Sequence, residues 1–497
     1  MFTPTYDEIR QSQQISYDRE VQRGTVVPFA WPFSVLSYFL LIAYLQLSYY
    51  EQVRRLKYAV LLIIYALSWY SILFCRTLGL VYGLGVALVA VWPMLSGWTL
   101  LIATRPHTDF KRLVRNDRNV RHNGHGPISR AVKSSVDGGV NSTSEFYWQA
   151  MPENFWQRLF WVYDLTFSYR GPHWSWSHTT ATPAMQTPQS TPHVSGRHPN
   201  FIHTSSHYAT FYILIDLIKG IMLTDPYFLG LGTSMSPSWL AQESSIMHWF
   251  LLRSFRDSMT IFAIWTVLQY GTALSALVND HFVPRGYALG DDSIPELVRP
   301  LFGPVSAVLG SGLAGFWGVF WHQTLRFAFV SNGRWAARLL GYHERSPQAR
   351  HIVVITAFAL SGVGHAAAAF TGWGNRDQPY RQAGKAFSFF ALQIVGIYLQ
   401  ALLFPSIVIK DKKASQMSRK ARYANIAFTL TWLWLTGPLL IDPLARGGTW
   451  LFEPLPFSFV RGLGLSSDKR WWCWKSVDWG RWAYDEKRWW LSGYQIK

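Results

Sequence analysis

The run LGLVYGLGVALVAVWPMLSGWTLLIA, residues 78–103, carries no charged side chain and decides the class of fold. It is longer than the roughly 20 apolar residues that a helix needs to cross the hydrocarbon core of a bilayer. Because a backbone in lipid must satisfy its own hydrogen bonds, a helix is the form that such a run takes there. The stretch therefore predicts a membrane-spanning helix.

Comparable apolar runs recur along the chain. Charged residues make up only 15% of the 497 residues, whereas a soluble domain has about 25%. We therefore expect an all-α polytopic membrane protein with about eight transmembrane helices plus interfacial helices. The other predicted spans are residues 29–50, 57–74, 208–230, 256–278, 351–370, 384–409 and 424–441.

Lysine and arginine give the chain a formal charge of +18. They gather in three connecting segments, at residues 51–57, 105–133 and 410–422. With eight spans these segments face one side of the membrane, which the positive-inside rule makes cytosolic, and both termini are then luminal. The basic excess reflects topology and attraction to anionic headgroups, so we expect the bilayer, and not nucleic acid, as a partner. The expected location is the endoplasmic reticulum, as a multi-pass protein.

Composition divides the chain into four parts. Residues 1–103 hold an N-terminal segment and the first three spans, and residues 104–207 form a basic, partly disordered cytosolic loop. Residues 208–445 form the membrane core, and residues 446–497 form a tail whose many tryptophans predict an interfacial position. Within the loop, residues 175–200 are rich in Ser, Thr, Pro and His, a composition that cannot offset the entropy of ordering.

The histidines of this loop suggest a metal site at first sight. Their spacing is irregular and they lack cysteine or carboxylate partners, so we interpret the loop as a solvated linker. Cys75 and Cys473 form neither a disulfide framework nor a metal-ligand spacing, and no bound metal is expected. The loop histidines are His173, His178, His193, His198, His203 and His207.

Two further histidines, His322 and His365, lie inside strongly apolar, helix-like segments. Small residues surround both at helical spacing, among them Gly318 and Gly362. Small residues let membrane helices pack closely, but they also leave room for a ligand beside each ring. An ionisable side chain in a membrane segment is costly and marks a functional candidate. Haem ligation by the two histidines is one possible function. General-base catalysis on an alcohol is another, and it requires no residue beyond those already present.

At this point the motifs show a resemblance. FWGVFWHQ (316–323) and SGVGHAAAAF (361–370), which place the two histidines 43 positions apart, resemble the paired motifs of the membrane-bound O-acyltransferases, in the wax-synthase-like branch common in fungi. PLFG (300–303) and LTFSYRGPHW (165–174) are similar to that branch too, and the resemblance is clearest over about residues 155–445. It implies an acyltransferase fold of many spans, with acyl-CoA as cosubstrate and no permanently bound cofactor.

The resemblance also implies roles for individual residues. His365 matches the family's near-invariant histidine and would be the general base. His322 matches a position that holds His, Asn or Asp and would position the substrates and polarise the thioester. The chain departs from the branch at Val319 and Phe320, where basic residues are usual. The residues expected to bind substrate are Trp317, Trp321, Gln323, Arg326 and Ser361.

The resemblance favours an O-acyltransferase that moves an acyl group, with acetyl preferred, from acyl-CoA to a hydroxyl of a hydrophobic acceptor. A terpenoid or meroterpenoid secondary metabolite is the expected acceptor. A long-chain wax or sterol ester synthase is one alternative. A membrane transporter with a histidine proton relay and a haem-linked redox protein are alternatives of other classes. The acceptor, the acyl length and the oligomeric state are left open.

The predicted orientation is testable at Asn141, which begins the glycosylation sequon Asn141-Ser142-Thr143 inside the predicted cytosolic loop. A cytosolic sequon receives no glycan. Endoglycosidase treatment of the protein from a eukaryotic host should therefore leave its gel mobility unchanged and equal to that of Asn141→Gln. A mass shift that this variant abolishes would overturn the orientation.

Overall fold

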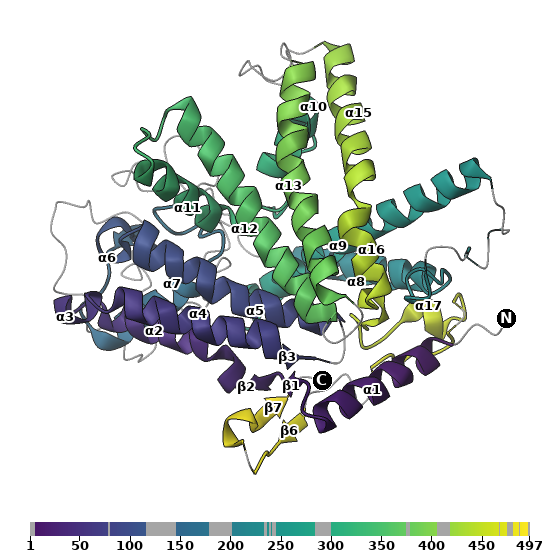
Figure 1. The fold of residues 1–497 in the computed structure, drawn as a ribbon, viewed down its shortest axis with the longest axis horizontal. Helices are drawn as coiled ribbons and strands as arrows, with labels where there is room; N and C mark the ends of the chain where they lie inside the picture. The colour runs from purple at the N-terminus through teal and green to yellow at the C-terminus, as the bar shows by residue number, and fades with distance from the viewer. Residues whose placement is uncertain are drawn as a thin grey trace.

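The computed structural model describes residues 5–77, 80–115, 146–177, 201–232, 236–237, 240, 245–283, 300–373, 378–404, 418–466, 468–474, 481–486 and 488–495. Within them the protein is mostly helical, with three small sheets at its edges (Figure 1). The helices are α1 Tyr6–Gln22, η1 Phe33–Val35, α2 Leu36–Leu47, α3 Glu51–Arg54, α4 Lys57–Phe74, α5 Leu80–Trp98, η2 Thr99–Ala103, α6 Pro106–Asp109, α7 Phe155–Phe167, α8 Phe201–Met222, α9 Ile246–His281, α10 Ser306–Gly315, η7 Phe316–Phe320, α11 Arg326–Leu339, α12 Pro347–Trp373, α13 Pro379–Leu403, α15 Arg419–Thr436, α16 Pro438–Arg446, η9 Thr449–Leu451, α17 Phe459–Gly462 and η11 Trp489–Leu491.

The strands are short and join distant parts of the chain. Strand β1 (Val27–Pro28) pairs in parallel with β3 (Cys75–Arg76). Strand β7 (Gly493–Gln495) lies between β2 (Ala30–Trp31) and β6 (Arg481–Ala483), antiparallel to both, and β4 pairs antiparallel with β5. The last pair, Arg112–Arg115 with Phe146–Gln149, lies inside the predicted loop. The all-helical expectation therefore holds except at these edges.

Five helices in the described ranges are long and apolar enough to cross a membrane. They are α4, the segment Gly85–Ala103 of α5 and η2, α9, α12 and α13. Helices α15 and α16, bent by 44° at their break, make a sixth if they count as one span. The chain is thus a multi-pass membrane protein, and its described residues hold five or six candidate spans where the sequence predicts about eight.

Two predicted spans account for the difference. In residues 29–50, strand β2 and a 3-10 turn precede α2, which is left with only 12 residues. In residues 208–230, the end of α8 carries Asp216 and Lys219, both buried against the C-terminal tail. Helices α4 and α5 separate the basic segments 51–57 and 105–133, so these two lie on the same side of the membrane. Segment 410–422 follows α9, α12 and α13, so among the described helices it shares that side only if α8 also crosses the membrane.

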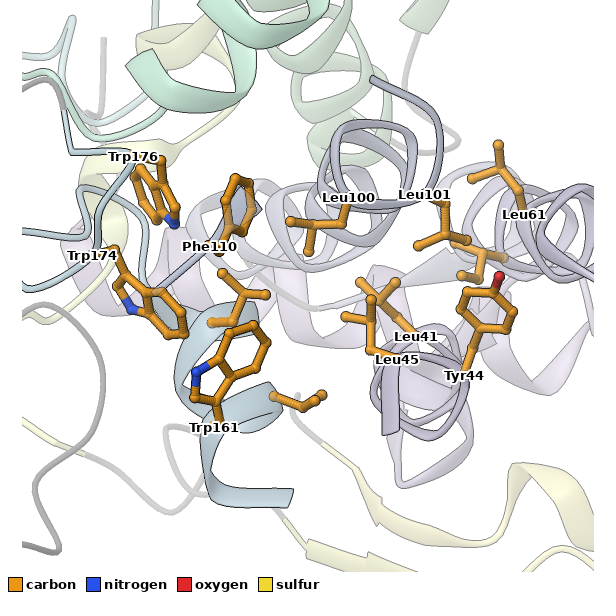
Figure 2. Close-up of a cluster of buried hydrophobic side chains, with 13 residues drawn as sticks. Leu41, Tyr44, Leu45, Leu61, Leu100, Leu101, Phe110, Trp161, Trp174 and Trp176 are labelled. Carbon is orange, nitrogen blue, oxygen red and sulfur yellow. The ribbon is translucent and has the colours of Figure 1, made fainter. Parts of the chain in front are cut away.

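A large apolar core joins α2, α4, η2 and α7. Figure 2 shows Trp161 of α7 beside Trp174 of the following turn at one end of the cluster, with Leu41 and Leu45 of α2 toward the other end. The rings of Trp161 and Trp174 meet edge to face at 4.9 Å, and both are almost fully buried. Part of the predicted loop therefore folds onto the first helices.

This packing corrects the interpretation of His173. Its ring is fully buried, and its Nε2 lies 2.6 Å from Asp164 Oδ2, so it is not part of a solvated linker. The carboxylate partner sits on α7, nine residues upstream, where sequence spacing alone did not reveal it. His203 and His207 lie on exposed positions of α8. His178, His193, His198, Asn141 and most of residues 175–200 lie outside the described residues.

The C-terminal tail closes on the N-terminus through a buried polar cluster. Arg461 donates two hydrogen bonds to the Glu453 carboxylate, at 2.9 and 2.5 Å, and both residues are almost fully buried. The Tyr6 hydroxyl of α1 donates to the same carboxylate. Lys219 of α8 donates to the carbonyl oxygen of Phe452 at 2.9 Å. The outer tryptophans of the tail stay exposed, as an interfacial position requires, and that position remains a prediction.

Helix α10 is broken at Gly312, where φ is +56°. A Cβ at this position would lie 1.9 Å from the side-chain nitrogen of Gln400 on α13. Gln400 Oε1 accepts a hydrogen bond from the backbone N–H of Leu313, and its Nε2 donates to Asn425 on α15. Asn425 donates in turn to the carbonyl of Leu309 on α10. The two buried amides thus satisfy the backbone that the break exposes, as lipid requires.

We predict that Gly312→Ala is strongly destabilising, by about 2–4 kcal/mol, because it combines a strained φ with the loss of buried hydrogen bonds. The measurement is the melting temperature of the detergent-purified protein. Gly271→Ala is the matched control, since a Cβ on that α9 glycine meets nothing within 4 Å. Equal melting temperatures for the two variants would contradict the assigned role of the break.

Candidate active site

His365 lies in α12, the helix that packs against α5, α11 and α13. Its Nδ1 is 2.9 Å from the carbonyl oxygen of Ser361, one turn earlier. A carbonyl only accepts hydrogen bonds, so Nδ1 carries the proton and the neutral ring keeps its lone pair on Nε2. Ser361, expected to bind substrate, is seen here orienting the histidine through its backbone.

The His365 side chain is exposed in the structure, although α12 packs against three other helices. One side of its ring is covered by Phe390 of α13, with ring centroids 4.3 Å apart. Phe358, two turns earlier on the same face of α12, contacts Trp317 of η7. The imidazole therefore lies on the same face of α12 as Phe358, which contacts η7.

The aromatic residues of the FWGVFWHQ motif form a wider turn than an α-helix has. Residues Phe316–Phe320 are a π-helix, in which the Trp321 N–H bonds the Phe316 carbonyl at 2.7 Å. This wider turn stacks the rings of Phe316 and Trp321, with centroids 5.6 Å apart and planes within 20°. The helix ends there, because Trp321 is extended, and His322 follows in an irregular turn. Short π-helical turns occur frequently at functional sites.

His322 lies against the rings of Trp321 and Phe302. Its Nδ1 is buried and has no hydrogen-bond partner in the part of the chain that the structure describes. Burial and, to a smaller extent, the nearby His365 lower the pKa of His322 to about 4, so its ring is neutral at physiological pH. The two histidines, distant in sequence, are thus close enough to interact electrostatically.

Trp317 connects the two histidines. Its ring contacts Phe390, which covers His365, and Trp321, which precedes His322. Its indole N–H donates to Gln393 Oε1 at 3.2 Å, and this fully buried glutamine of α13 is anchored in turn to the Phe389 carbonyl. Sequence reasoning missed Gln393. The signal was an amide in an apolar helix, seven residues before Gln400 and hence on the same face.

Gln323 and Arg326 hold the end of the π-helix. Gln323 donates to the carbonyls of Trp317 and Trp321, at 3.1 and 2.6 Å. Arg326 donates to Gln323 Oε1 at 2.9 Å and to the Gly318 carbonyl at 2.5 Å. These bonds satisfy carbonyls that the helix end leaves free. The structure thus shows Gln323 and Arg326 stabilising the end of η7, and substrate binding by these two side chains remains a proposal.

The motifs PLFG (300–303) and LTFSYRGPHW (165–174) connect to the same region as η7 and His322. The N–H of Gly303 bonds the Phe320 carbonyl at 2.9 Å, and Phe302 contacts Trp321. Arg170 donates to the Pro300 carbonyl at 3.0 Å. Segments 165–174, 300–303, 316–323 and 361–370 thus converge around one pair of histidines. In the described ranges, no three His, Cys, Asp or Glu side chains are arranged to hold a metal ion.

Two histidines from distant segments thus lie near one wall of aromatic rings. The model of the membrane bound O-acyl transferase family matches residues 298–392, which include every candidate site residue. Over these residues the chain is similar to that family.

Two named proteins are similar to this chain. The acetyltransferase nanB of Aspergillus nanangensis is 27% identical over 225 residues, covering 45% of this chain and 48% of that protein. The acetyltransferase atnC of Arthrinium sp is 29% identical over 226 residues, covering 43% and 47%. The chain thus aligns with about half the length of these relatives. No solved structure matches it significantly.

Proposed function

We propose that this protein transfers an acetyl group from acetyl-CoA to a hydroxyl of a hydrophobic alcohol, with a terpenoid or meroterpenoid secondary metabolite as the acceptor and the endoplasmic reticulum as the location. The observation that carries the proposal is His365, whose Nδ1 bonds the Ser361 carbonyl and whose lone pair is therefore on Nε2, near a neutral His322. The names of the two relatives support acetyl as the group transferred. The membrane-spanning helices around the site support a hydrophobic acceptor.

In the proposed reaction, His365 Nε2 removes the proton of the acceptor hydroxyl. The oxygen attacks the thioester carbonyl carbon, a C–O bond forms and the C–S bond breaks. The imidazolium returns its proton to the departing CoA sulfur, so the histidine is regenerated. The hydrogen bond from Nδ1 to the Ser361 carbonyl holds the ring in the required tautomer and stabilises its charged form.

His322 has the complementary role. A neutral ring can donate a hydrogen bond to the thioester oxygen, where negative charge develops during attack. The rings of Phe316, Trp317 and Trp321 cover this side of the site and would exclude water, which otherwise hydrolyses the thioester. A long-chain ester synthase would use the same two histidines with a different donor. A proton-relay transporter would use them without consuming acyl-CoA.

We expect His365→Ala to reduce acetyl transfer by about 10²–10⁴-fold, the usual contribution of a general base. The assay supplies labelled acetyl-CoA and a terpenoid alcohol to microsomes that contain the protein, with its abundance checked by immunoblot. His351→Ala is the matched control, because His351 lies on the same helix and bonds Tyr398 instead of facing His322. Unchanged turnover in His365→Ala would remove the proposed base. A mass-spectrometric screen of sterol, fatty and terpenoid alcohols then identifies the acceptor.

We expect His322→Asn to keep a substantial part of the activity and His322→Ala to lose about 10²–10³-fold, the cost of removing one donor to a developing oxyanion. An amide can donate the same hydrogen bond, whereas a methyl group cannot. The comparison is of kcat at saturating acetyl-CoA in the same microsomes. Equal activities in the two variants would exclude a hydrogen-bonding role for His322.

A further inference from the structure

Beside the candidate base, the α13 side of the site is filled by one aromatic ring. Phe390 is 4% exposed, and its ring centroid lies 4.3 Å from that of His365 with the planes tilted by 35°. Among the residues that the structure describes, Phe390 is the one whose aromatic ring contacts His365. Anything that grows from the reacting carbon toward α13 therefore meets Phe390 first.

The ring has little freedom to move away. Phe389 packs edge to face against it at 5.0 Å, and Trp317 lies 6.1 Å from it. Trp317 is itself fixed by Gln393 and flanked by Phe358 at 6.0 Å. The neighbours of Phe390 thus form a continuous wall of rings.

Helix α12 closes the remaining direction. A Cβ on Gly362, three residues before His365, would lie 3.0 Å from Phe387 and 3.4 Å from the Cβ of Phe390. The two helices are therefore as close here as glycine allows. Phe390 cannot retreat toward α12, and its ring stays beside the imidazole.

We propose that Phe390 determines the length of the acyl group, by occupying the space that carbons beyond an acetyl methyl would need. The inference rests on the proposed function and concerns the same site. The acceptor oxygen must be within about 2.6–3.2 Å of the base to lose its proton. The carbonyl carbon that it attacks, and the first carbons of the acyl chain, consequently lie within a few ångströms of the His365 ring, where Phe390 stands. The donor class is short acyl-CoA, with acetyl-CoA preferred.

The test is a donor competition with the full-length protein in microsomes. Acetyl-CoA and hexanoyl-CoA are supplied at equal concentration with one acceptor alcohol, and both esters are quantified by mass spectrometry. Wild type should form mainly the acetyl ester. Phe390→Ala should raise the ratio of hexanoyl to acetyl ester by about 10-fold or more, since single methylenes in an apolar pocket are worth about 10–200-fold. Phe390→Leu, a smaller truncation, should give a smaller increase.

Phe389→Ala is the matched control. Phe389 is the adjacent residue, is 5% exposed and packs on both Trp317 and Phe390, but it has no ring contact with His365. Its truncation should leave the ester ratio unchanged. A ratio that moves equally in Phe389→Ala would mean that general loosening, and not Phe390, governs the donor.

Other outcomes separate the two proposals. If wild type uses hexanoyl-CoA as well as acetyl-CoA, the inference on Phe390 fails while the proposed function stands. If wild type transfers neither group, the proposed function itself fails. If Phe390→Ala and Phe390→Leu are as abundant as wild type but inactive, or active with an unchanged ratio, Phe390 does not set the length.

Discussion

The candidate site depends on how the chain satisfies the backbone at the break in helix α10. At Gly312 the backbone of α10 leaves the helical conformation, and the amide of Gln400 bonds the freed N–H of Leu313. Gln400 is held by Asn425, which also bonds α10, so three helices are tied at this point. An unpaired buried backbone group costs about as much free energy as a lost hydrogen bond, so this connection stabilises the break. It determines where η7 begins, and hence where its rings and His322 lie.

The same face of α13 serves the other half of the site. Gln393, two turns before Gln400, bonds the indole of Trp317, and Phe390 covers His365. One helix therefore fixes the break in α10, the aromatic wall and the surroundings of the base. The two histidines come from segments with different local structure, an irregular turn and the middle of a long helix. Their proximity results from tertiary packing and not from either segment alone.

Helix positions and the two histidines could be predicted, because apolar runs and ionisable residues within them are local signals. The number of spans could not, because Asp216 and Lys219 of α8 find buried partners in a tail more than 200 residues away. Contacts between individual side chains could not be predicted either, such as the one between the buried His173 and the Asp164 carboxylate. Whether η7 would be α- or π-helical was also hidden, since the same aromatic spacing suits both. Gln393 was not predicted because a neutral amide in an apolar helix is a weaker sequence signal than a charged side chain.

The buried cluster around Glu453 has a consequence for biosynthesis. Tyr6 and Glu453 are 447 residues apart, so the first helix obtains this partner only when the ribosome has made nearly all of the described chain. At about 5–20 residues per second, that delay is roughly 20–90 seconds. Until then Tyr6 and Lys219 lack the acceptors that they have in the finished protein. A nascent chain interrupted before Trp450 lacks the acceptors of both groups, which exposes it to the quality control that removes incomplete membrane proteins.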